Sequence, residues 1–183
     1  GPRTVAPAPA CGYKRRMSRV RDDNPENPGE IRLAIENEAA LGRLAARLAA
    51  CARPGDLIAL EGDLGTGKTS FARAFIRSLQ DEPEDVPSPT FTLLQSYETN
   101  SGLVHHFDLY RIENPAELGP LGFEEALGEG IVLVEWPERL GALLPVGRLS
   151  LRLEFGPTPD SRRATLRGSG NWAARMRDIA FDQ

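Results

Sequence analysis

The sequence predicts an α/β fold of three layers, in which a largely parallel central sheet lies between helices. Two short runs, residues 57–60 and residues 131–134, are apolar at every position, as parallel strands covered on both faces are. Segments whose apolar residues recur at helical spacing separate these runs, and such alternation is typical of α/β proteins. The length of 183 residues corresponds to one domain.

From residue 31 on, helices and strands alternate with short turns between them. The expected elements are a helix over 37–52, a strand over 57–60, a helix over 68–80, strands over 91–98 and 103–110, short helices within 115–127, a strand over 131–134, strands over 149–155 and 162–168, and a closing helix over 171–182. In the first helix, Leu41, Leu44 and Leu48 form an apolar stripe that follows the N-cap Asn37.

The later elements rest on similar signals. Phe71, Phe75 and Leu79 give the second helix its period, and the turn over residues 99–102 predicts a hairpin between the two strands beside it. Apolar and polar residues alternate over 149–155, as in a strand with one wet face. Its partner strand completes a C-terminal antiparallel hairpin.

Residues 1–30 are expected to form a disordered tail, and residues 31–183 a single domain. The tail is rich in proline and charge and poor in large apolar side chains. Met17 is the expected natural start, which would leave residues 1–16 outside the native protein. Apart from Tyr13, no aromatic residue accompanies the basic residues there, which favours a solvated tail over a nucleic-acid arm.

The composition argues against several classes of partner. The 22 basic and 26 acidic residues leave a net charge of −4, so no general attraction to DNA or to an anionic membrane is expected. No apolar run approaches the roughly 18 residues of a membrane span, and no secretion signal follows the basic N-terminal residues. A cytoplasmic location is expected.

The most specific motif is a phosphate-binding loop. Its residues, which match G-x-x-x-x-G-K-[ST] between an expected strand and helix, are Gly62, Asp63, Leu64, Gly65, Thr66, Gly67, Lys68 and Thr69. The glycines let successive backbone N–H groups point at phosphate oxygens. Lys68 would lie between the β- and γ-phosphates, and the Thr69 hydroxyl would bind Mg²⁺. Ser70 follows directly and is expected to share in nucleotide binding.

Lysine is rare in this chain. Lys14 and Lys68 are the only lysines among 22 basic residues. The guanidinium of arginine is bulkier than an ammonium and would not fit the interior of the loop, so the lysine at position 68 supports the nucleotide site. With so few lysines the chain cannot contain the Asn-Lys-x-Asp segment that reads guanine, which favours ATP.

Two acidic residues are candidates for the metal site that nucleotide hydrolysis needs. Glu135 directly follows the apolar run 131–134, and Asp108 ends a weaker run. The pattern favours Glu135 as the metal-holding residue, although each carboxylate also fits a solvated strand end. His105 and His106 are adjacent, so their side chains would face opposite sides of a strand, which favours structural roles over a shared metal.

Three further segments follow the loop in order, residues 88–92, 106–111 and 133–136. With the loop, they make the region from Ile31 to Arg167 resemble the TsaE family, the bacterial P-loop ATPases of the tRNA threonylcarbamoyladenosine pathway. The resemblance implies a P-loop NTPase-like fold that binds ATP with Mg²⁺. It also implies TsaD and TsaB as partners, with tRNA met only through them, and ATP hydrolysis that resets their complex between turnovers.

The resemblance also implies roles for single residues. Thr69 and Glu135 would hold Mg²⁺. Thr90 would lie in a switch-like loop near the γ-phosphate, and Asp108 would position the attacking water; together with Lys68 these are the expected catalytic residues.

Two residues near the motifs are expected beside the nucleotide. The resemblance implies an arginine from the last hairpin, for which Arg162 is chosen over the adjacent Arg163. Trp136 follows the metal-holding acid directly and would lie close enough to report nucleotide binding, although it also fits a core position.

Two other functions remain open. One is a P-loop kinase acting on a small molecule or nucleoside, and the other is a nucleotide-sensing module without turnover. A kinase usually adds an arginine-bearing lid, and no insertion of that length is visible. Dependence on partners separates the candidates, because a TsaE-like protein should be slow alone and stimulated by TsaB and TsaD.

Overall fold

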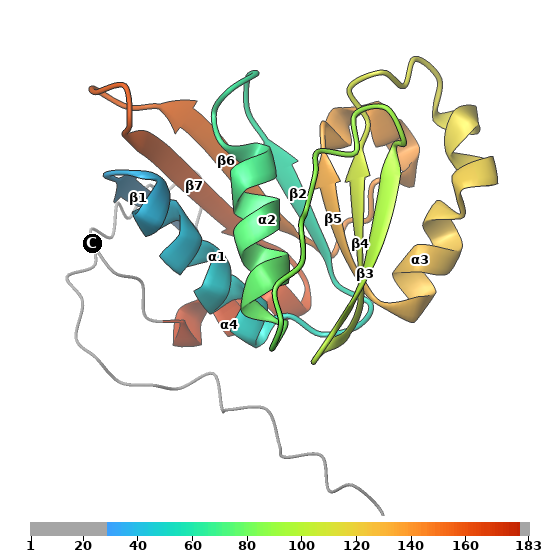
Figure 1. The fold of residues 1–183 in the computed structure, drawn as a ribbon, viewed down its shortest axis with the longest axis horizontal. Helices are drawn as coiled ribbons and strands as arrows, with labels where there is room; N and C mark the ends of the chain where they lie inside the picture. Colours follow the sequence, from blue (N-terminus) through green and yellow to red (C-terminus); the bar gives the residue numbers. More distant parts are fainter. Residues whose placement is uncertain (1–28, 180–183) are drawn as a thin grey trace, which may run out of the picture.

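A computed structural model describes residues 29–179, which Figure 1 shows as a ribbon. Its elements are β1 (Glu30–Ile35), α1 (Glu38–Cys51), β2 (Leu57–Glu61), α2 (Lys68–Ser78), β3 (Leu94–Thr99), β4 (Gly102–Asp108), the 3₁₀ segment η1 (Pro115–Leu121), α3 (Phe123–Glu129), β5 (Ile131–Glu135), the 3₁₀ segment η2 (Pro137–Leu143), β6 (Leu149–Phe155), β7 (Arg162–Gly168) and α4 (Asn171–Asp178). The expected natural start at Met17 and the expected tail, except for its last two residues, lie outside the described range.

All seven strands form one sheet, in the order β1-β7-β6-β2-β5-β4-β3. The four central strands β6, β2, β5 and β4 run parallel to one another. The remaining strands pair antiparallel, with β1 and β7 on one side and β3 on the other. The predicted α/β class, with its largely parallel sheet and its C-terminal hairpin of β6 and β7, is therefore confirmed.

Helices cover both faces of the sheet, as Figure 1 shows. In β2, Ile58 and Leu60 pack into a core with residues of α1, α2 and α4, whereas Leu57 and Ala59 pack into a second core with residues of η1, α3 and η2. This double burial explains why the strand is apolar at every position.

Some elements differ from the expectation. Strand β1 was not predicted; its buried residues Leu33 and Ile35 alternate with exposed ones, and the strand is only six residues long. Strand β3 begins at Leu94 rather than at residue 91, because Leu93 has a left-handed backbone (φ 66°) that interrupts the extended conformation. The N-cap of α1 is confirmed, since the Asn37 side chain accepts a hydrogen bond from the N–H of Ala40 at 2.9 Å.

The parallel strands bring distant parts of the chain to one edge. The loop over residues 62–67 leaves the carboxyl end of β2, and β5 lies directly beside that strand. On the other side of β5, Asp108 of β4 is the register partner of Glu135. The glycine loop and both candidate carboxylates therefore meet at one end of the sheet.

Candidate nucleotide site

The loop between β2 and α2 is shaped by its first and last glycines. Gly62 has φ 143°, and a Cβ there would lie 2.4 Å from the carbonyl oxygen of Leu153, so a side chain would collide with backbone. Gly67 has φ 108° and caps α2. Within the loop, the Thr66 hydroxyl donates a hydrogen bond to the carbonyl of Asp63 at 2.9 Å. This tight curl directs α2, with its positive N-terminal end, at the space in front of the loop.

Lys68 folds back into the loop and is 5% exposed. Its Nζ donates hydrogen bonds to the carbonyl oxygens of Gly62 at 2.5 Å and Asp63 at 2.8 Å. Burial lowers the pKa of Lys68, and the opposing charges of Glu135 and Asp108 offset part of that effect. A cation is therefore held at the place where the motif requires one.

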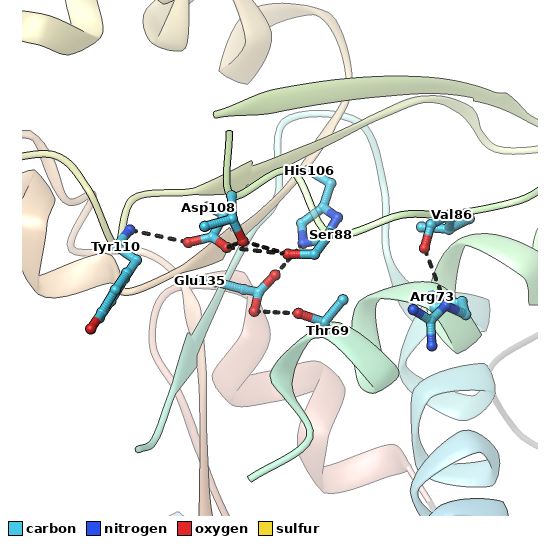
Figure 2. A network of polar contacts seen from close by, with 9 residues as sticks. Thr69, Arg73, Val86, Ser88, His106, Asp108, Tyr110 and Glu135 are labelled. Atoms are coloured by element: carbon cyan, nitrogen blue, oxygen red, sulfur yellow. Dashed lines mark hydrogen bonds and ion pairs between the residues drawn. The ribbon is translucent and has the colours of Figure 1, made fainter. Parts of the chain in front are cut away.

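Thr69 and Glu135, the two expected Mg²⁺ ligands, are in direct contact. The Thr69 hydroxyl donates a hydrogen bond to Oε1 of Glu135 at 2.8 Å, and Nε2 of His106 lies 2.7 Å from Oε2 of the same carboxylate. Figure 2 shows this chain of contacts from α2 through β5 to β4. Glu135 is 3% exposed, so each of its oxygens is bound by a neighbour rather than by bulk water.

Asp108 contacts the loop that carries Ser88, as Figure 2 shows. Its Oδ2 accepts hydrogen bonds from the hydroxyls of Thr90 at 2.9 Å and Ser88 at 3.4 Å, and its Oδ1 accepts one from the N–H of Tyr110 at 3.0 Å. The two hydroxyls are also 2.7 Å apart. The segment expected to act as a switch is thus hydrogen-bonded to the Asp108 carboxylate, and Asp108 is 4% exposed.

These groups surround one cavity of about 350 Å³. Its lining residues are Leu64, Gly65, Gly67, Lys68, Thr69, Ser70, Ser88, Thr90, Asp108, Tyr110, Glu135 and Trp136. The other expected loop residues, Gly62, Asp63 and Thr66, line a neighbouring hollow of about 650 Å³ that shares Trp136. The structure therefore brings together every residue expected at the loop, the switch-like segment and the metal site.

Arg162 reaches the loop from β7 and binds its backbone. Its Nε donates a hydrogen bond to the carbonyl of Thr66 at 3.0 Å, and its Nη2 donates to that of Gly65 at 3.3 Å. Nη1 is bound by two carbonyls of the turn before β7. Arg162 was expected beside the nucleotide, and in this structure it binds carbonyls of the loop and of the turn before β7. The adjacent Arg163 is exposed, on the opposite face of β7.

The oxygen donors of Thr69 and Glu135 fit Mg²⁺. In residues 29–179 no three His, Cys, Asp or Glu side chains are grouped so as to hold a metal ion. Mg²⁺ does not require such a cage, since in nucleotide sites it takes one or two protein oxygens and completes its shell with phosphate and water. Two adjacent oxygen donors at the mouth of a phosphate loop match that demand.

Sequence reasoning missed two features of the site. His106 was assigned a structural role, yet it contacts Glu135; the signal was its spacing of two residues from Asp108, which puts both side chains on one face of β4. Trp136 has a left-handed backbone with φ 59°, which turns the chain sharply after Glu135. Nothing in the local sequence predicts a left-handed backbone at this tryptophan.

No helix in the described range has the length and apolarity needed to cross a bilayer.

Comparison with known proteins gives consistent matches. The family model described as "Threonylcarbamoyl adenosine biosynthesis protein TsaE" matches residues 35–164. The tRNA threonylcarbamoyladenosine biosynthesis protein TsaE of Rickettsia felis is 43% identical over 122 residues, covering 67% of this chain and 71% of that protein. The protein of the same name from Bacillus subtilis is 39% identical over 137 residues, covering 74% and 82%.

A solved structure agrees with the sequence matches. The crystal structure of Bacillus subtilis YdiB aligns with a TM-score of 0.67 at 31% identity, covering 81% of this chain and 92% of that one. The match of the family model to most of the described domain, supported by these relatives, shows that the chain belongs to the TsaE family, the tRNA threonylcarbamoyladenosine biosynthesis proteins.

Proposed function

We propose that this protein binds and hydrolyses ATP with Mg²⁺ and thereby serves tRNA threonylcarbamoyladenosine biosynthesis, resetting a TsaB–TsaD complex between turnovers. One observation carries the proposal: Lys68, Thr69, Asp108 and Glu135, from three separate parts of the chain, line the same cavity in front of a phosphate-binding loop. The relatives are tRNA threonylcarbamoyladenosine biosynthesis proteins, which supports the pathway.

Each group has a task in phosphate binding and hydrolysis. The Lys68 ammonium, held by the carbonyls of Gly62 and Asp63, is positioned to bind the β- and γ-phosphates as they enter the loop. Thr69 and Glu135 would hold Mg²⁺, which neutralises phosphate charge when bound. Arg162 supports the loop from outside through the carbonyls of Gly65 and Thr66.

Asp108 is suited to orient the attacking water. Its carboxylate is fixed on one side by the N–H of Tyr110 and lines the cavity beside Glu135. An incoming γ-phosphate would compete for the Thr90 hydroxyl that Asp108 now holds. Release of Thr90 toward phosphate would free Oδ2 for water, which couples the state of the nucleotide to the conformation of residues 88–93.

The decisive test is an ATPase assay of the protein alone and with TsaB, TsaD and tRNA. We expect slow turnover alone and clear stimulation by the partners. Lys68→Ala and Glu135→Ala should each reduce turnover on the order of 100-fold and abolish tRNA modification. The matched control is Glu129→Ala, since the Glu129 side chain is 55% exposed at the end of α3 and lines neither hollow.

The other functions make different predictions in the same assay. Turnover that needs a small-molecule or nucleoside acceptor and ignores TsaB and TsaD would support a kinase. Nucleotide binding without turnover under any combination would support a sensing module. Wild-type tRNA modification by Glu135→Ala would contradict the assignment of the metal site.

A further inference from the structure

His106 is buried next to the expected metal site. Its side chain is 0% exposed on β4, and its Nε2 lies 2.7 Å from Oε2 of Glu135, a residue of the neighbouring strand. The other carboxylate oxygen, Oε1, accepts the hydrogen bond from Thr69. Glu135 is therefore bound at both oxygens, by partners from α2 and from β4.

The surroundings of the imidazole decide where its proton lies. The other ring nitrogen, Nδ1, is buried and has no hydrogen-bond partner among residues 29–179. A buried N–H without an acceptor costs more free energy than a bare ring nitrogen, because the N–H is the stronger polar group. In the neutral ring the proton therefore belongs on Nε2, from which it is donated to Glu135.

We propose that His106 is a positioning residue, which holds the Glu135 carboxylate in place through an Nε2–H hydrogen bond when Mg²⁺ and nucleotide bind. The role follows from the two partners of Glu135. Thr69 is itself an expected Mg²⁺ ligand, whereas His106 is not among the expected ligands and contacts Oε2 from the neighbouring strand. Residues that hydrogen-bond to a metal ligand commonly contribute roughly 10- to 100-fold to metal affinity.

The neighbouring histidine offers a matched control. His105 and His106 are the only histidines of the chain. His105 is also largely buried, at 6% exposure, but it lies on the other face of β4, where its Nδ1 is 2.7 Å from the Ser96 hydroxyl. Substitution of His105 thus perturbs the same strand without touching Glu135.

The first experiment measures the affinity for a non-hydrolysable ATP analogue by calorimetry, with and without Mg²⁺, on the full chain. We expect His106→Leu to lose most of the Mg²⁺-dependent affinity, roughly 10-fold or more, and to keep the Mg²⁺-independent affinity. His106→Gln retains an N–H donor and should recover most of the loss, and His105→Leu should behave as wild type. Circular dichroism melts confirm that each variant is folded.

The inference rests on the proposed function for its ligand. The possible outcomes distinguish a failure of the proposed function from a failure of the role of His106. Wild-type protein that binds the analogue equally with and without Mg²⁺ would overturn both. Mg²⁺-dependent binding in the wild type that survives unchanged in His106→Leu would overturn only the role of His106. An equal loss in His105→Leu would also overturn it, by showing a general effect on β4.

The second experiment needs no nucleotide and observes His106 in the wild-type protein. Nitrogen-15 NMR of the wild-type imidazoles distinguishes the two neutral tautomers, and His105→Leu assigns the signals because only His106 remains. We expect a proton on Nε2 of His106. A ring protonated on Nδ1 alone would lack the donor to Glu135 and would overturn the proposal.

Discussion

The Nζ atom of Lys68 lies 4.3 Å from the centre of the Trp136 ring. The ammonium is thus enclosed by two backbone carbonyls and one aromatic face, and a cation over an indole ring is an attractive arrangement. Trp136 reaches this position because its left-handed backbone turns the chain immediately after Glu135, and its ring also packs against Tyr110 with centroids 5.0 Å apart. The loop lysine and the residue after Glu135 are therefore in direct contact.

Replacement of Lys68 by methionine should increase the stability of the nucleotide-free protein near neutral pH. Burial lowers the pKa of Lys68, so the charged form is less favourable in the folded chain than in the unfolded chain. The unfolded chain then binds more protons in the alkaline range below the ordinary value of 10.5, and wild-type stability rises with pH there. Urea unfolding at pH 7 and pH 10 measures this difference between the variants.

The same substitution should weaken ATP binding by roughly 100-fold, because a buried charge partner of the phosphates is lost. A Lys68→Met protein that is less stable than wild type at pH 7 and equally stable at pH 10 would contradict the stated direction of the pKa.

Trp136 should report nucleotide binding by fluorescence. The chain has two tryptophans, and Trp172→Phe leaves Trp136 alone. Because Trp136 lines the cavity and contacts Lys68, its emission should change when ATP and Mg²⁺ are added. The control is Trp136→Phe, whose remaining Trp172 is buried in α4 away from the cavity lining and should stay silent. Equal responses from both variants would show a global change instead.

Gly62→Ala should destabilise the protein by about 1–3 kcal/mol, as expected for an enforced strained backbone. A Cβ at Gly62 would meet the Leu153 carbonyl oxygen at 2.4 Å, and its φ of 143° is unfavourable for alanine. The matched control is Gly128→Ala in α3, where a Cβ would meet no atom within 4 Å. That change should instead stabilise the helix by about 0.5–1 kcal/mol. Urea unfolding compares the two, and a Gly62→Ala protein as stable as wild type would contradict this loop geometry.

Arg162→Met should weaken ATP binding. This effect does not require Arg162 to contact the nucleotide. The side chain binds the carbonyls of Gly65 and Thr66, so its loss loosens the backbone that presents N–H groups to phosphate. We expect a loss of roughly 10-fold, about the value of one hydrogen bond from a charged donor. Arg163→Met is the control, because Arg163 is exposed on the opposite face of β7. Calorimetric titration that finds equal affinities for both variants would refute a specific role for Arg162.

Asp56→Ala should destabilise the fold by roughly 3 kcal/mol, since it leaves a largely buried arginine without its partner. Arg175 of α4 binds both oxygens of Asp56, at 2.5 Å and 2.8 Å, and the two side chains are 13% and 11% exposed. Asp85→Ala is the comparison, because Asp85 is 93% exposed and 3.8 Å from Arg77, and it should change stability by less than about 0.5 kcal/mol. Similar unfolding midpoints for the two variants would show that the Asp56–Arg175 pair is dispensable.

Structural features that depend on neighbouring residues could be predicted from the sequence, whereas features that depend on residues far along the chain could not. The N-cap Asn37 and the helix that starts at Lys68 follow from the spacing of nearby residues, and both are confirmed. Strand β1 was missed because it is only six residues long and its pairing partner β7 lies far along the chain. The contact of His106 with Glu135 was missed because it joins side chains 29 residues apart.

By itself the sequence determined the α/β class, the glycine loop with its lysine, and the acidic residues at two strand ends, because residue spacing and backbone sterics act within a few positions. Only the tertiary structure decided that β5 lies between β2 and β4, which makes Asp108 and Glu135 register partners beside Thr69. It also decided that Arg162 binds the loop backbone and that His106 contacts Glu135. Strand order and side-chain contacts below 3 Å depend on packing among distant segments. Local residue patterns do not predict that packing.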